Sequence, residues 1–84
     1  MPKQKVEGLI TKLHDQLSTA ETSPEQERLM QQMQSQLSGW EGDVPGDGDI
    51  RKTAELLIDE LEEERPTLAM IAKDIVETLH NAGL

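Results

Sequence analysis

The chain has 84 residues, 17 of them acidic and 8 basic, which gives a net charge of -9 at pH 7. This length fits a single domain over residues 1–84. The absence of cysteine excludes disulfides and thiolate metal sites. The acidic balance argues against nucleic acid as a partner, because phosphate binding needs a basic patch. No stretch is apolar for long enough to span a membrane or to serve as a secretory signal, so we expect no membrane partner and a cytoplasmic location.

The first half of the chain carries two helical patterns. Apolar residues at helical spacing predict a helix over 2–18: Val6, Leu9, Ile10, Leu13 and Leu17. Ser23, Pro24 and Gln26 have the pattern of a capping box with proline at the first helical position, which predicts a second helix over 24–38. The short connector between the two helices indicates an antiparallel hairpin.

The second half follows a Gly- and Asp-rich loop over 39–49, where Asp49 is suited to cap the next helix. An apolar stripe keeps its helical phase from residue 54 to residue 82, across Pro66. We therefore favour one long helix over 50–82, kinked at Pro66. A break into helices over 50–65 and 67–82 is the alternative, because proline disfavours helical geometry at Arg65. The sequence thus predicts an all-α fold, a small bundle in which an N-terminal hairpin packs on a long C-terminal helix kinked or broken at Pro66.

Several segments resemble a bacterial family of short acidic proteins, the domain-of-unknown-function 4404 family. They are Pro66-Thr67-Leu68, the ending from Leu79 to Leu84, and the hairpin segments Leu13–Leu17 and Ser23–Arg28. The resemblance covers most of the chain and rests on structural motifs. Arg65 stands where the family pattern has histidine before the proline, so a role tied to that histidine does not transfer. The resemblance implies the helical architecture and no activity, ligand or catalytic residue.

One candidate cation site lies in the loop and consists of Asp43, Asp47 and Asp49. A calcium loop that starts at Asp43 needs an oxygen ligand at its third position and a bidentate glutamate at its twelfth. These positions hold Pro45 and Ala54, so we expect no bound metal. A loop that uses Gly and Asp for turns and a helix cap explains the same residues, and cation binding is kept as an alternative function.

Catalytic motifs are not evident in the sequence. The serines have no nucleophile motif around them, and His14 and His80 do not have the spacing of a helical zinc pair. A small bundle without aromatic walls is a poor place for a shielded carboxylate. We therefore predict a protein that is not an enzyme and needs no cofactor.

Excess apolar surface is the stronger functional signal. Leu56, Met70 and Val76 lie beside the predicted stripes and widen them, and Trp40, the single aromatic residue, either caps the core or anchors an interface. Such width indicates deeper burial within one bundle or a protein partner, and we expect a homodimer. The acidic run over 59–64 suggests a second alternative, a docking face for a basic partner, although a solvated helix face is the simpler interpretation.

Overall fold

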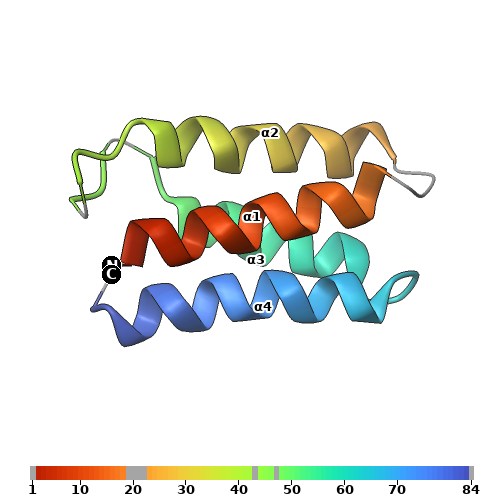
Figure 1. Ribbon diagram of the computed structural model, residues 1–84. Helices are drawn as coiled ribbons and strands as arrows, with labels where there is room; N and C mark the ends of the chain where they lie inside the picture. The colour runs from red at the N-terminus through yellow and green to blue at the C-terminus, as the bar shows by residue number, and fades with distance from the viewer. Residues whose placement is uncertain (1, 19–22, 43, 47, 84) are drawn as a thin grey trace.

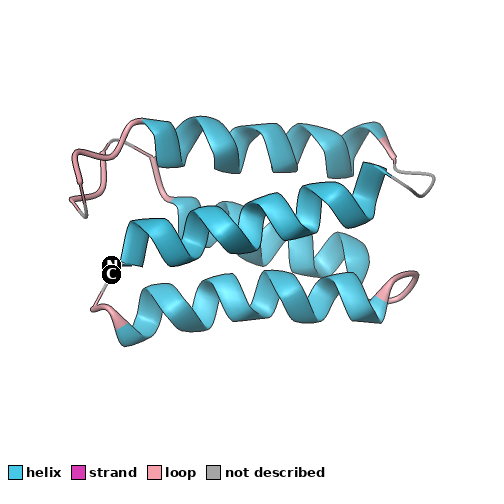
Figure 2. Ribbon diagram, in the orientation of Figure 1, coloured by secondary structure: helices cyan, strands magenta, loops and turns pink. Residues whose placement is uncertain are grey.

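The computed structural model describes residues 2–18, 23–42, 44–46 and 48–83. Most of these residues belong to four helices: α1 (Pro2–Ser18), α2 (Pro24–Ser38), α3 (Ile50–Leu61) and α4 (Pro66–Asn81). Figure 2 shows helices joined by loops, with no strand in the described part of the chain. The predicted all-α fold is confirmed.

The helices form an up-and-down bundle in which consecutive helices run antiparallel (Figure 1). α1 packs against α2 and α4, and α3 packs against the same two helices, so α1 and α3 lie diagonally across the bundle. The start of α1 and the end of α4 lie at the same end as the loop from α2 to α3. The turn between α3 and α4 lies at the other end.

An aliphatic core joins the four helices, and each helix buries its apolar stripe as the periodicity predicts. The buried apolar side chains are Val6, Ile10, Leu13 and Leu17 from α1, Leu29, Met30, Met33 and Leu37 from α2, Trp40 from the loop, Ile50, Ala54, Leu57 and Leu61 from α3, and Leu68, Ala69, Ile71, Ala72, Ile75 and Leu79 from α4. Full burial of one large aliphatic side chain contributes about 1.5–3 kcal/mol. The core therefore stabilises the bundle far more than its exposed ion pairs do.

The structure corrects the long kinked helix that we favoured over 50–82. α3 ends at Leu61, and the chain turns back through residues 62–65 into α4. Arg65 has φ -140° and ψ 70°, outside helical geometry. The ring of Pro66 disfavours the helical conformation at the preceding residue, and Pro66 has no N–H to continue the helical ladder. The structure shows the alternative prediction, two helices separated by a break before Pro66.

The helical spacing of apolar residues continues across Pro66 for a reason other than a continuous helix. α3 and α4 pack against each other antiparallel, and their stripes face one shared core. Two helices that face the same core keep an apolar pattern on both sides of a turn, so the phase does not require a continuous helix. One charge of the acidic run over 59–64 is paired in this arrangement, because Lys73 Nζ of α4 lies 3.3 Å from Glu62 Oε1 in the turn.

Glycines shape the loop between α2 and α3. Glu41 and Val44 exchange two backbone hydrogen bonds of 3.0 Å, and Gly42 between them has φ +60°, which glycine adopts without strain. Gly46 lies so close to the carbonyl oxygen of Gly39 that a Cβ at this position would collide with the backbone. This path leads the chain from the end of α2 to the start of α3.

Candidate functional site

Trp40 belongs to the core. Its side chain is 4% exposed, and Lys3 Nζ donates a hydrogen bond of 3.2 Å to its carbonyl oxygen, which links the start of α1 to the end of α2. Of the two roles predicted for this residue, the structure places it in the core-capping role. The interface-anchor role is corrected, because a buried indole is not accessible to a partner.

The candidate cation ligands are divided between described and undescribed residues. Asp49 is the N-cap of α3, and its Oδ1 accepts a hydrogen bond of 3.2 Å from the Lys52 N–H. Asp43 and Asp47 lie outside the described residues. Within the described part of the chain, no three histidine, aspartate or glutamate side chains are grouped as ligands of a metal ion. The one described member of the predicted set therefore has a structural role as a helix cap.

The predicted interaction residues Leu56, Met70 and Val76 do not form one face. Leu56 is 47% exposed and Met70 is 65% exposed, whereas Val76 is partly buried against the core. Ile58 shares a groove with Val76. Leu56 and Ile58 are two positions apart on α3, which is about 200° around a helix, so Leu56 lies on the opposite side of α3 from Val76.

An open groove of about 330 Å³ lies between α3 and α4. Ile58 and Val76 provide its apolar part, and both are partly buried and packed on the core. The remaining lining residues carry polar or charged groups: Arg51 from α3, and Lys73, Glu77 and His80 from α4. We call this surface the α3–α4 groove. It combines two apolar side chains with polar and charged side chains from both helices.

Sequence reasoning missed the α3–α4 groove. Along one continuous helix, Ile58 and Val76 would lie roughly 27 Å apart at a rise of 1.5 Å per residue. Only the turn at 62–65 brings the two helices side by side. The available signal was local, namely charged residues such as Arg51 and Lys73 next to the edges of both apolar stripes.

A second groove, of about 450 Å³, lies between α1 and α2. Its lining residues are Lys3, Glu7, Ile10, Thr11, Gln34, Leu37 and Ser38. The two apolar members, Ile10 and Leu37, are themselves buried in the core. The accessible lining is therefore polar, and this groove offers less apolar contact than the α3–α4 groove.

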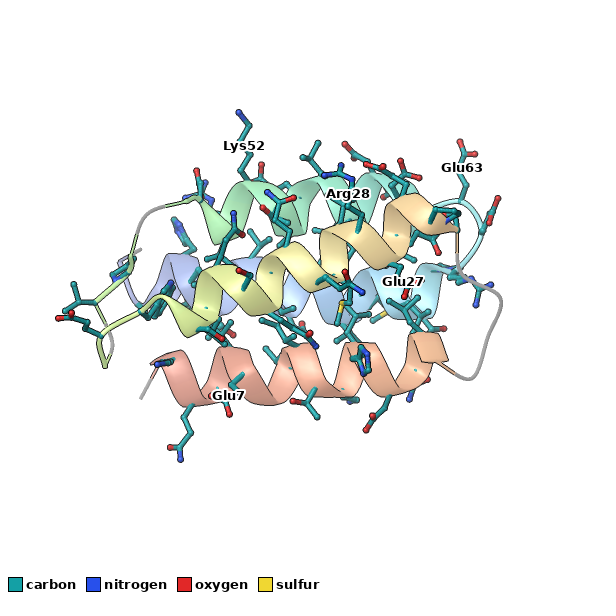
Figure 3. The ribbon with its side chains drawn as sticks, turned by 90° about the horizontal axis from the view of Figure 1, so that it is seen from above. Glu7, Glu27, Arg28, Lys52 and Glu63 are labelled. Carbon is teal, nitrogen blue, oxygen red and sulfur yellow. The ribbon has the colours of Figure 1, made fainter. Side chains whose placement is uncertain are left out.

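The start of α2 lies beside the end of α3. Gln26, which is 3% exposed, donates a hydrogen bond of 3.5 Å from Nε2 to the carbonyl oxygen of Glu60. The predicted capping box is therefore half formed: Ser23 Oγ accepts from the Gln26 N–H at 3.2 Å, while Gln26 Oε1 has no hydrogen-bond partner. This contact joins the acidic start of α2 to the acidic run over 59–64, and Figure 3 shows Glu27 and Glu63 in the same half of the bundle.

Arg28 reduces the local negative charge at this acidic end. Its guanidinium binds both carboxylate oxygens of Glu25, with Nη2 2.5 Å from Oε1 and Nε 3.2 Å from Oε2. The hydrogen bond from Arg28 lowers the pKa of Glu25 below its ordinary value, and the same bond raises the pKa of Arg28. Both side chains are about half exposed, at 59% and 46%, so the pair adds little to stability.

The fold and these surfaces define a class, the small acidic four-helix bundles with up-and-down topology. The chain belongs to the family described as Domain of unknown function (DUF4404), whose model matches residues 3–84. The resemblance noted at Pro66-Thr67-Leu68 and at the C-terminal residues is thereby confirmed. No curated protein and no solved structure matches the chain. In the described part of the chain, no helix has both the length and the apolarity needed to cross a membrane.

Proposed function

We propose that the protein is a non-catalytic interaction protein that works by self-association as a homodimer in the cytoplasm. The observation that carries this proposal is the apolar surface left outside the core: Leu56 and Met70 are exposed, and Ile58 and Val76 are partly exposed. A chain of 84 residues with an aliphatic core has a thin stability margin. Association that buries further apolar area lowers the free energy of the folded state, with a gross gain of about 25 cal/mol per Å² that the entropy cost of association offsets in part.

The available surface is large enough for such an interface. A standard interface buries about 800 Å² per partner, a modest part of the 5224 Å² surface of the chain. One face along a pair of helices therefore suffices, and the rest of the acidic surface keeps the dimer hydrated.

Light scattering after size exclusion, over a dilution series, tests the proposal. We expect a mass near twice the 9.4 kDa of one chain at high concentration, falling on dilution as the dimer dissociates. A mass of 9.4 kDa at every concentration contradicts self-association.

A docking face for a basic partner is the second candidate function. The contact between Gln26 and Glu60 favours it, because this contact places Glu25 and Glu27 next to the acidic run over 59–64. Calorimetric titration with an oligolysine peptide at low and high salt tests it. We expect binding that weakens with salt and that the double variant Glu27→Gln/Glu63→Gln reduces. Glu7→Gln is the control on α1, across the bundle from Glu63 (Figure 3), and an equal effect of this control contradicts a defined face.

A further inference from the structure

We propose that the α3–α4 groove is the surface through which two copies of this chain associate, related by a two-fold axis. This inference rests on the proposed self-association and adds the position of the dimer interface. In the dimer, the α3–α4 groove of one copy packs against the α3–α4 groove of the other.

The centre of the α3–α4 groove is apolar. Ile58 and Val76 pack against the core from adjacent helices and keep part of their side chains accessible. A second copy placed on this surface removes the accessible part from water. The same contact extends the core outward without unfolding any helix.

The charges around this centre alternate. The cation Arg51 precedes Ile58 on α3, and the anion Glu62 follows α3 as the first residue of the turn, at the margin of the groove. α4 runs antiparallel, and its Lys73 lies at the Glu62 end, where the two side chains are 3.3 Å apart. Glu77 comes one turn later on α4, towards the Arg51 end. The Glu62 end therefore has the cation Lys73 beside the anion Glu62 at its margin. The Arg51 end has the cation Arg51 with two anions, Glu77 and Glu55, and Glu55 Oε1 lies 3.4 Å from Arg51 Nε. A cation precedes an anion along both helices, so the order of charges in space is opposite on the two antiparallel helices.

This alternation makes the surface complementary to itself. In a two-fold dimer, the same patch of both copies meets itself. With the axis along the groove, α3 of one copy lies over α4 of the other, and Arg51 meets Glu77. With the axis across the groove, α3 lies over α3, and Arg51 meets Glu62. Both arrangements bring opposite charges together, while the exposed ion pairs within each chain are weak enough to exchange partners.

The other exposed apolar side chains lie outside this groove. Leu56 has Lys52 one turn before it on α3 and Asp59 and Glu60 one turn after it, so charged side chains flank it on both sides. Val44 is 65% exposed and lies in the loop between α2 and α3. Met70 is 65% exposed and does not line the groove. The α3–α4 groove differs from these positions because it joins two apolar side chains from adjacent helices with charges of both signs.

Matched variants on α4 test the location. Val76→Glu introduces a charge inside the groove, and Met70→Glu introduces the same charge on the same helix outside it. By sedimentation velocity, we expect Val76→Glu to raise the dimer Kd by about 100-fold or more and Met70→Glu to change it by less than about threefold. Circular dichroism establishes that each variant is folded.

A second pair tests the charge pattern without altering the packing. Lys73→Glu and Lys52→Glu change the net charge equally, but only Lys73 lines the groove, whereas Lys52 points away from the bundle (Figure 3). We expect Lys73→Glu to weaken the dimer about tenfold more than Lys52→Glu does. If Val76→Glu does not fold, the comparison of Lys73→Glu with Lys52→Glu tests whether the α3–α4 groove is the dimer interface.

Two results overturn the inference, and they are distinct. A wild-type dimer that Val76→Glu and Lys73→Glu weaken no more than their controls places the interface elsewhere and leaves self-association intact. A wild-type chain that is monomeric at all concentrations overturns the proposed function and this inference together.

Discussion

At the scale of single residues, two glycines have opposite consequences for stability. Gly46 approaches the carbonyl oxygen of Gly39 so closely that a side chain has no room. Gly8 lies within α1, and a Cβ there has nothing within 4 Å. Gly46 is therefore required by a close backbone approach, whereas Gly8 only adds conformational freedom to the unfolded chain.

Alanine substitution at both positions measures this difference. We expect Gly46→Ala to destabilise the fold by about 1–3 kcal/mol and Gly8→Ala to stabilise it by about 0.5–1 kcal/mol. Urea unfolding followed by circular dichroism gives both values. Equal effects of the two substitutions would show that the loop path does not depend on Gly46.

The pair of Glu25 and Arg28 predicts a pH dependence with a defined sign. Because Arg28 lowers the pKa of Glu25 in the folded state, the pair contributes stability above the unfolded pKa and loses it as the pH falls through the lowered pKa. In denaturation series at several pH values, we expect a small, constant difference between wild type and Arg28→Gln near neutrality. This difference should shrink in acid, and one that grows in acid would contradict the assignment.

At the scale of helices, prediction worked where the signals were local. The bounds of α1 and α2 and the caps at Ser23 and Asp49 follow from periodicity and from side chains a few residues away. The helix break before Pro66 was harder to predict. The proline favours a break, whereas the regular spacing of apolar residues on both sides of it suggested one continuous helix. The α3–α4 groove was not predictable, since it depends on how α3 and α4 are placed, and no spacing within one helix encodes that placement.

Pro66→Ala separates the effects of proline and packing on the turn at 62–65. If the shared core holds the turn, the variant keeps two helices and loses about 0.4–1 kcal/mol through greater freedom of the unfolded chain. NMR chemical shifts then show residues 62–65 as non-helical in both proteins. Helical shifts through residue 65 would instead show that the proline ring alone separates α3 from α4.

Asp49 tests whether the loop works as a helix cap or as part of a cation site. We expect Asp49→Ala to lower the unfolding free energy by about 0.5–2 kcal/mol, and Asp49→Ser, which retains an acceptor, to lose little. Thermal melting with and without millimolar calcium provides the second readout. A rise in Tm with calcium that Asp49→Ser abolishes would favour the cation hypothesis over the capping role.

At the scale of the whole molecule, net charge opposes association. Two copies that each carry a charge of -9 repel over a distance that salt shortens, from about 30 Å at 0.01 M to about 10 Å at 0.1 M. Exposed ion pairs at the interface are worth only about 0–1 kcal/mol each. Salt therefore weakens these attractive pairs by less than it weakens the repulsion between the two chains. We therefore expect sedimentation to show tighter dimers as salt rises, and dissociation by salt would contradict this balance.

Isotope-filtered NMR on an equal mixture of labelled and unlabelled chains tests the central claim most directly. This measurement detects contacts between methyl groups of different chains. The account predicts such contacts for Ile58 and Val76 and none for Leu56 or Met70. Intermolecular contacts confined to Leu56 or Met70, or the absence of any intermolecular contact at concentrations where a dimer would form, would contradict self-association through the α3–α4 groove.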